Sequence, residues 1–283
     1  MSTLRFAVFG NPIKHSYSPM MHSLFAQSLG INLQYDKQLV ALDGFAQAVQ
    51  EFFANGGSGL NITVPFKLEA YDLAQQALSP RAQAAGSVNT LWFEAGQIHG
   101  DNTDGIGLIK DLQRQGVKLA GRRILLIGAG GAARGALLPL LQSQCQALHI
   151  ANRTASKAQE LAQMMLTHYR LAPEQQLSAS GLAHIPGTWD VIINASSSSL
   201  SDAPLAVSEA IFHAESFAYD MLYSATAETT FLHQAQAAGV KQLSDGLGML
   251  VYQGAEAFRI WHQQEPDALP VLQALREALQ ATA

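Results

Sequence analysis

The stretch Arg123-Ile-Leu-Leu-Ile-Gly-Ala-Gly-Gly-Ala-Ala-Arg134 decides the fold class. Its apolar run predicts a buried strand, and the small residues after it predict a tight turn from which a helix begins. The turn has the G-x-G-x-x-A spacing of dinucleotide-binding sites, with Gly128, Gly130 and Ala133 at the small positions. Because a helix N-terminus attracts phosphate groups, we expect a pyrophosphate to bind here. The residues expected to hold it are Gly128, Ala129, Gly130, Gly131, Ala132 and Ala133.

The segment after the next expected strand, residues 148–151, indicates which dinucleotide binds. It reads Asn152-Arg153-Thr154, and no acidic residue lies between Asn152 and Lys157. An acidic side chain there would bind the ribose 2′-hydroxyl of NAD, whereas arginine suits the 2′-phosphate of NADP. The sequence therefore predicts NADP as the cofactor. A purely structural turn is the alternative, because glycines also end ordinary strands.

Composition narrows the class of protein. The chain has 283 residues, 48% apolar and 14% charged, which is enough to bury the cores of one large or two ordinary domains. A net charge of −5 without Lys/Arg runs argues against nucleic acid or an acidic membrane as a partner. No apolar run approaches the roughly 20 residues of a membrane span, and a secretory signal pattern is missing. The nine histidines have no metal-ligand spacing. We expect a cytoplasmic protein without a metal site.

Strand and helix signals alternate along the chain, which predicts the α/β class. Before the glycine motif, strands are expected at 5–9, 34–40, 59–64 and 87–93, and after it at 190–194 and 217–220. Pro65 is expected to open a helix at its first position. We therefore expect two α/β domains. The first is residues 1–103, completed by C-terminal helices within 239–283, and the second is a Rossmann-type domain at 104–238.

Polar residues gather at the ends of the strands expected in the first domain. Asn61 and Thr63 are two apart, so both side chains project from the same face of a strand. Lys67 falls in the first turn of the next helix, where the helix dipole disfavours a cation. A solvated surface lysine is the simpler interpretation of Lys67. The neighbouring polar pair favours a functional site instead.

Three further polar segments allow two interpretations each. Asp104, in the segment Gly100-Asp-Asn-Thr-Asp-Gly105, precedes a helix and suits an N-cap as well as a site. Ser18 precedes Pro19 and suits a cap, yet with Ser16 it also suits a substrate carboxylate at a helix N-terminus. Asn89 interrupts a strand-like run, where it either needs buried partners or lies at an exposed strand end.

Taken together, seven segments in order resemble the conserved blocks of the shikimate dehydrogenase family, from about residue 6 to past residue 260. They are His15-Ser-Tyr-Ser-Pro19, Asn61-Ile-Thr-Val-Pro-Phe-Lys67, Val88-Asn-Thr90, Gly100-Asp-Asn-Thr-Asp-Gly105, Ile127-Gly-Ala-Gly-Gly-Ala-Ala-Arg134, Asn152-Arg-Thr154 and Asp245-Gly-Leu-Gly-Met-Leu250. The resemblance implies a substrate-binding domain, an NADP-binding domain and an active-site cleft between them. It also implies reversible hydride transfer between NADP and shikimate, with 3-dehydroshikimate as the ketone, in chorismate and aromatic amino acid biosynthesis.

The resemblance also implies a role for each matching residue. Lys67 is the acid/base group and Asp104 its charged partner. Ser16 and Ser18 hold the substrate carboxylate, with Tyr223 nearby. Asn61, Thr63, Asn89 and Gln253 bond the ring hydroxyls or orient the pair. The cofactor's 2′-phosphate is assigned to Asn152, Arg153, Thr154 and Lys157. Its nicotinamide side is assigned to Met221 and Gly246.

Some positions depart from the family pattern and leave alternatives open. Ser199 stands where the family usually has glycine, Lys157 where arginine is common, and Tyr17 between the two serines has no assigned role. The nearest alternative is a quinate/shikimate dehydrogenase that also uses NAD, which the absence of an acidic residue after Asn152 disfavours. A non-catalytic NADP-binding sensor is another, disfavoured by the presence of Lys67 and Asp104. An unrelated NADP reductase would not match the N-terminal segments.

Overall fold

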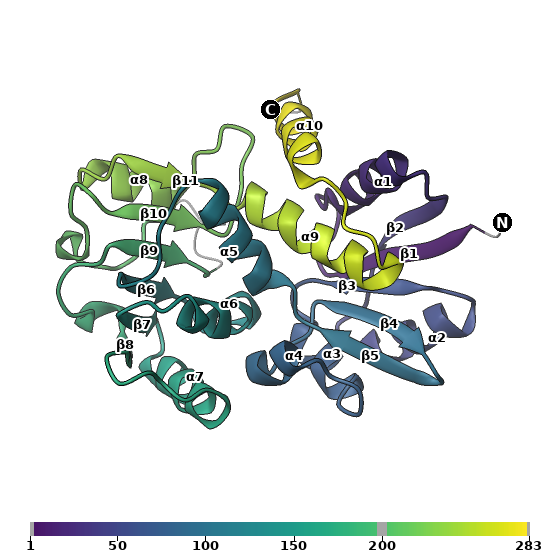
Figure 1. The fold of residues 1–283 in the computed structure, drawn as a ribbon, viewed down its shortest axis with the longest axis horizontal. Helices are drawn as coiled ribbons and strands as arrows, with labels where there is room; N and C mark the ends of the chain where they lie inside the picture. The colour runs from purple at the N-terminus through teal and green to yellow at the C-terminus, as the bar shows by residue number, and fades with distance from the viewer. Residues whose placement is uncertain (1–2, 197–202, 282–283) are drawn as a thin grey trace. The chain divides into compact units, whose positions relative to one another are not determined.

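The computed structural model describes residues 3–196 and 203–281 and divides into two compact units (Figure 1). Unit 1 comprises Met1–Gly107 and Leu250–Ala278, and unit 2 comprises Leu108–Met249 and Leu279–Ala283. Both units are α/β, as the alternating signals predict. Ser199 lies outside the described residues, so its departure from the family pattern has no structural counterpart here.

Unit 1 is built on a five-stranded mixed sheet with the order β2-β1-β3-β4-β5. Parallel pairing joins β1 (Leu4–Gly10) to β2 (Leu33–Leu39) and to β3 (Gly59–Ile62). The next two strands, β4 (Thr90–Glu94) and β5 (Gln97–Asp101), form an antiparallel hairpin on β3. Because β3 and β4 run in opposite directions, the end of β3, the start of β4 and the end of β5 meet at one edge.

Helices cover both faces of the unit 1 sheet. One face packs on α2 (Phe45–Ala54), α3 (Lys67–Leu73) and α4 (Pro80–Ala85) through a core that includes Phe9, Leu60 and Phe66. The other face packs Phe6 and aromatic neighbours against α1 (Ser18–Leu29) and α9 (Leu247–His262). The last helix is α10 (Ala268–Ala281).

Unit 2 is built on a six-stranded parallel sheet with the order β11-β10-β9-β6-β7-β8. Its strands are β6 (Arg123–Ile127), β7 (Ala147–Asn152), β8 (Gln176–Gly181), β9 (Val191–Asn194), β10 (Phe217–Asp220) and β11 (Gln242–Ser244). Its helices are α6 (Gly131–Gln142), α7 (Ala155–His168) and α8 (Thr230–Ala237), with 3₁₀ turns at Leu182–His184 and Glu209–Ile211. The helix α5 (Asp104–Arg114) begins in unit 1 and belongs to unit 2 from Leu108 onward. Numbered within the unit, the order is the 3-2-1-4-5-6 of dinucleotide-binding sheets, in which the crevice lies where the order reverses, between β6 and β9.

Three local expectations from the sequence are wrong. Pro65 does not open a helix, because the Phe66 N–H donates to the Thr63 carbonyl in a turn and α3 begins at Lys67. Ser18 is not the N-cap, because the first helical hydrogen bond runs from Met21 to the Tyr17 carbonyl and Tyr17 occupies that position. The strand expected at 87–93 begins only at Thr90.

Candidate active site

Three polar segments of unit 1 meet at the edge where β3 ends. The register of the sheet sets Asn61 opposite Thr90 and Thr90 opposite Asp101. Lys67 follows β3 by one turn, and Asp104 follows β5 and begins α5. Residues far apart in sequence are thus collected by strand pairing alone, before any side chain is considered.

Lys67 and Asp104 form a direct ion pair. The Lys67 Nζ lies 2.5 Å from Asp104 Oδ2, and the two side chains are 15% and 6% exposed. Lys67 is the first residue of α3, where the helix dipole opposes a cation, so the carboxylate offsets an otherwise unfavourable position. A solvated surface lysine would not have this environment. The other carboxylate oxygen of Asp104 accepts a hydrogen bond from Asn89 Nδ2 at 2.9 Å.

Asn89 organises the residues around this pair. Its Nδ2 also lies 2.9 Å from Thr103 Oγ1 and 3.1 Å from Gln253 Oε1, so its two hydrogens are shared among three acceptors. Its Oδ1 accepts from the Thr103 backbone N–H and the Thr90 hydroxyl, each at 2.9 Å. The side chain is 2% exposed and its hydrogen-bonding capacity is filled, so the geometry favours an orienting role for Asn89 over direct contact with a substrate.

A second branch of the network leads through Asn61 toward the serine pair. The Asn61 Nδ2 faces the Asn89 carbonyl and the Thr90 hydroxyl, each at 3.4 Å, and its Oδ1 accepts from the Tyr35 hydroxyl at 2.7 Å. The Ser18 side chain lies close to the same hydroxyl. Ser16 Oγ donates to Ser18 Oγ at 3.2 Å. Five of the expected site residues therefore belong to one hydrogen-bonded network, namely Asn61, Lys67, Asn89, Asp104 and Gln253, and the serine pair lies beside it next to Tyr35.

Two further expected site residues are Thr63 and Tyr223. Thr63 lies just beyond β3, with its side chain against Gly10 at the end of β1, and its backbone N–H donates to the Phe9 carbonyl. Tyr223 belongs to unit 2 and is partly exposed.

Three residues that were not expected from the sequence also belong to this network, namely Tyr35, Thr90 and Thr103. Thr103 directly precedes Asp104, so its position in the same polar segment was an available signal. Tyr35 is the only buried residue of the edge strand β2. Its burial depends on α1 packing over that edge, which strand alternation by itself does not predict.

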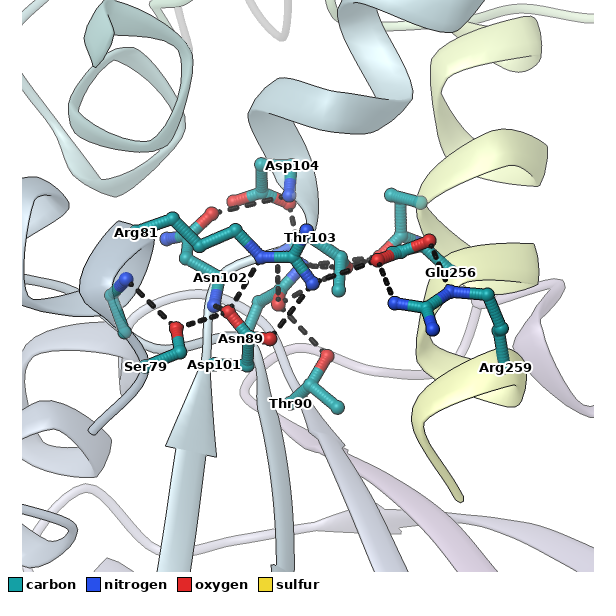
Figure 2. A network of polar contacts seen from close by, with 12 residues as sticks. Ser79, Arg81, Asn89, Thr90, Asp101, Asn102, Thr103, Asp104, Glu256 and Arg259 are labelled. Carbon is teal, nitrogen blue, oxygen red and sulfur yellow. Dashed lines mark hydrogen bonds and ion pairs between the residues drawn. The ribbon is translucent and has the colours of Figure 1, made fainter. Parts of the chain in front are cut away.

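A group of ion pairs braces the segment that carries Asp104 (Figure 2). Arg81 of α4 donates to both carboxylate oxygens of Asp101, at 2.7 and 2.8 Å, and to Glu256 of α9 at 2.8 Å. Glu256 also accepts from Arg259 at 2.8 and 3.0 Å. Asp101 Oδ1 accepts from the Asn102 backbone N–H, and Asn102 Oδ1 accepts from the N–H of Asp104. The ion pairs therefore fix the turn from which Asp104 projects.

This arrangement predicts a specific dependence of stability on pH. Burial opposes ionisation of Glu256, but Arg259 and Arg81 outweigh it and lower the pKa of the carboxyl to about 2. A pKa lowered on folding contributes stability that is present above the unfolded value, near 4.5, and is lost as pH falls toward 2. We expect Glu256→Gln to cost roughly 1.5–3 kcal/mol at pH 7, and this deficit to shrink below pH 4.5.

Urea unfolding of both proteins from pH 7 to pH 3.5 measures this difference. The matched control is Glu277→Gln, because Glu277 is an exposed α10 residue whose side chain accepts only from Gln273 among the described residues. A deficit for Glu256→Gln that stays constant across this range would contradict the assignment of the pKa shift.

The glycine turn of unit 2 has the shape that a pyrophosphate needs. Gly128 has φ +121°, and an added Cβ would lie 3.0 Å from the Ala195 backbone at the end of β9, so a side chain is excluded there. Above Gly130 a Cβ would meet no atom within 4 Å. Gly130 is the N-cap of the 12-residue α6, and the buried Ala133 packs in its first turn. Open space over a helix N-terminus fits a dinucleotide phosphate.

The remaining expected cofactor residues lie at or just after the ends of β7, β10 and β11, except Lys157, which lies in the first turn of α7. The Asn152 side chain donates to the Thr154 carbonyl at 2.9 Å and shapes the turn before α7, while Arg153, Thr154 and Lys157 are exposed. Gly246 packs against the Met221 backbone so closely that any Cβ would clash with the Met221 carbonyl. The structure thus brings Met221 and Gly246 together.

Other classes of site receive no support in the described part of the chain. Within it, no cluster of three or more His, Cys, Asp or Glu side chains is placed to hold a metal ion. None of the helices formed by residues 3–196 and 203–281 is both long and apolar enough to cross a membrane.

A doubly wound sheet with a glycine turn at its first strand, in a chain that also carries a buried lysine–carboxylate pair, defines a dinucleotide-dependent dehydrogenase. Three family models refine this class: the shikimate dehydrogenase substrate binding domain at residues 8–91, shikimate/quinate 5-dehydrogenase at 111–211, and the shikimate 5′-dehydrogenase C-terminal domain at 246–276. The chain belongs to the shikimate dehydrogenase family.

Individual relatives support this assignment over the whole chain. The NADP⁺-dependent shikimate dehydrogenase of Cupriavidus necator is 51% identical, covering 98% of this chain and 95% of its own. That of Bordetella petrii is 49% identical, covering 98% and 96%. Among solved structures, the shikimate 5-dehydrogenase of Thermus thermophilus in complex with NADP(H) and shikimate has a TM-score of 0.80 at 32% identity, covering 98% of this chain and 100% of that one.

Proposed function

We propose that this protein catalyses the reversible NADP-dependent oxidation of shikimate to 3-dehydroshikimate. The observation that carries the proposal is the Lys67–Asp104 pair inside one hydrogen-bonded network with Asn61 and Gln253, beside the serine pair. Such a site offers a proton-transferring cation, a carboxylate and several hydroxyl-binding groups. A ring that carries a carboxylate and several hydroxyls matches this set.

The chemistry requires a proton to leave the substrate hydroxyl while a hydride leaves the same carbon. The Lys67 Nζ takes this proton as a neutral amine, after releasing its own proton to solvent, and Asp104, 2.5 Å away, holds the amine and stabilises the ammonium that forms. In the reverse direction the Lys67 ammonium stabilises the negative charge growing on the carbonyl oxygen and then donates its proton. Asn89 keeps Asp104 aligned throughout, because it bonds the carboxylate oxygen that Lys67 does not use. No metal is needed for these steps.

The substrate is oriented by the rest of the network. Ser16 and Ser18 lie at the N-terminus of the 12-residue α1, where hydroxyl and backbone donors suit the substrate carboxylate. Asn61 and Gln253 are assigned to the ring hydroxyls of the substrate. Thr63 and Tyr223 are proposed as further substrate-binding residues on the family resemblance alone. When NADP is bound, its nicotinamide supplies the hydride acceptor for oxidation and the hydride donor for reduction. The pyrophosphate of NADP is assigned to Gly128 to Ala133. Its 2′-phosphate is assigned to Asn152, Arg153, Thr154 and Lys157, and its nicotinamide side to Met221 and Gly246.

The direct test is NADPH formation, followed by its absorbance, with shikimate and quinate side by side. Quinate is included because the family model that matches residues 111–211 names both substrates. We expect reduction of NADP⁺ with shikimate and little with quinate. Equal rates on both would favour the broader quinate/shikimate specificity, and no reduction with either would favour a non-catalytic sensor.

Cofactor preference gives a second prediction. Arg153 is exposed at the end of β7, and no ion pair within the described residues engages it, so its guanidinium is available to the 2′-phosphate. A charge-assisted contact of this kind contributes roughly 1.5–3 kcal/mol. We therefore expect Arg153→Ala to raise the KM for NADP⁺ by about 10-fold to 150-fold, with the KM for NAD⁺ nearly unchanged.

Steady-state kinetics with both cofactors at saturating shikimate measure this effect. Arg170→Ala is the matched control, because it removes an exposed positive charge of unit 2 without touching the turn after β7. An equal rise of both KM values in Arg153→Ala would contradict the assignment of the 2′-phosphate site.

We also propose that the protein works in the cytoplasm, as a monomer or homodimer, without nucleic acid or membrane as a partner. A net charge of −5 and a single cysteine support this setting. Cell fractionation and sedimentation of the purified protein test it.

A further inference from the structure

Tyr35 is the one buried residue of the otherwise exposed edge strand β2, and its hydroxyl lies inside the proposed substrate site. The side chain is 7% exposed, and its ring stacks on the fully buried His22 with centroids 4.3 Å apart and an interplanar angle of 6°. Burial lowers the pKa of His22 to about 3, so the ring beneath Tyr35 is neutral at ordinary pH. The phenol is therefore fixed in position by apolar packing, with its hydroxyl as the only polar part.

Some groups around this hydroxyl can only accept a hydrogen bond. These groups determine which atom donates in each of the neighbouring hydrogen bonds. The Asn89 backbone carbonyl can only accept, so the Asn61 side chain must turn its NH₂ toward it. The Asn61 Oδ1 then faces Tyr35, so the Tyr35 hydroxyl must donate, at 2.7 Å. The Tyr35 oxygen is left to accept, and the Ser18 side chain lies close to it. Tyr35 therefore donates to Asn61, and Asn61 donates onward to the Asn89 carbonyl.

We propose that Tyr35 is a positioning residue that fixes the orientation of the Asn61 carboxamide by holding its Oδ1, so that the NH₂, whose two contacts are long at 3.4 Å, donates to a ring oxygen of the substrate. The inference rests on the proposed function, because it assigns Tyr35 a part in the same shikimate site. Without the Tyr35 hydroxyl, Asn61 Oδ1 loses its 2.7 Å donor, and the two remaining bonds of the carboxamide are both at 3.4 Å. The Asn61 carboxamide would then rotate, so that its oxygen and its NH₂ would alternate in the position that meets the substrate.

Tyr35→Phe tests this role, because it keeps the ring on His22 and removes only the hydroxyl. We expect the KM for shikimate to rise about tenfold, the change that loss of one such hydrogen bond gives, with kcat and the KM for NADP⁺ within about twofold of the parent. Tyr169→Phe is the matched control, since its hydroxyl donates to the Leu141 carbonyl at 3.4 Å in unit 2. We expect that variant to leave all three constants unchanged.

A double-mutant cycle separates positioning from a general loss of stability. If Tyr35 acts through Asn61, Tyr35→Phe raises the KM for shikimate less than twofold when it is added to Asn61→Ala. A tenfold rise that persists in the Asn61→Ala background, or Tyr35→Phe kinetics equal to the parent, overturns the inference while the parent still oxidises shikimate. A parent that neither binds nor oxidises shikimate overturns the proposed function itself, and the two failures are thereby distinguished.

Discussion

Lys67→Ala is expected to lower kcat for shikimate oxidation by about 100-fold or more, the range that removal of a general acid/base and its electrostatic stabilisation gives. Lys67 Nζ is the cation that lies on Asp104 at the edge where β3, β4 and β5 meet. Shikimate binding should weaken much less, because the serine pair and Asn61 remain in place. Steady-state kinetics and shikimate titration of the folded variant separate the two effects.

Lys67→Arg sharpens this test. Arginine keeps the positive charge but stays protonated under all assay conditions, so it cannot take a proton from the substrate. We expect kcat of Lys67→Arg to fall nearly as far as that of Lys67→Ala, with shikimate binding close to the parent. Lys118→Ala, which removes an exposed lysine of unit 2, is the control for loss of charge. Turnover of Lys67→Ala near the parent rate would end the proposed role of this lysine.

Elements that are contiguous in the chain were predicted well from the sequence. The apolar run before Gly128 and its spacing to Ala133 identify a strand, a turn and a helix that are contiguous in the chain, and the structure has β6 and α6 there. The hairpin strand β5 at residues 97–101 was not predicted, since its polar, short sequence lacks alternation. Element ends were also less predictable, as at Pro65, because local hydrogen bonds of the turn decide them.

The sequence predicted which residues form the site, but not the hydrogen bonds and ion pairs between them. Lys67 and Asp104 are 37 residues apart, and only the register of β3, β4 and β5 brings them together. Family resemblance supplied both residues without this geometry. Tyr35 could not be found in the same way, because its role depends on α1 packing over an edge strand and on the direction of a hydrogen bond. The ion pairs of Arg81 with Asp101 and Glu256 join residues up to 175 apart for the same reason.

Asp104→Ala is expected to impair both turnover and shikimate binding, with kcat lowered by about 100-fold. The carboxylate holds Lys67 Nζ at 2.5 Å and Asn89 Nδ2 at 2.9 Å, so its removal frees the lysine and unsettles the asparagine that also bonds Gln253. Lys67 would then be an unpaired cation at 15% exposure, beside a helix N-terminus that already disfavours it. Asp104→Asn keeps the shape but not the charge, and should lose turnover more than binding.

The double variant Lys67→Ala with Asp104→Ala decides whether the two residues act as a unit. If they do, its kcat should lie close to that of Lys67→Ala alone, because the carboxylate has no proton-transferring partner left to orient. Independent residues would instead multiply their losses to about 10⁴-fold. A simple helix cap at Asp104 predicts a third pattern: Asp104→Ala would cost about 0.5–2 kcal/mol in the free energy of unfolding, while Lys67→Ala would leave both stability and kcat near the parent. Urea unfolding and steady-state kinetics on the same four proteins distinguish the three patterns, since only the coupled pair gives a large loss in either single variant and little further loss in the double.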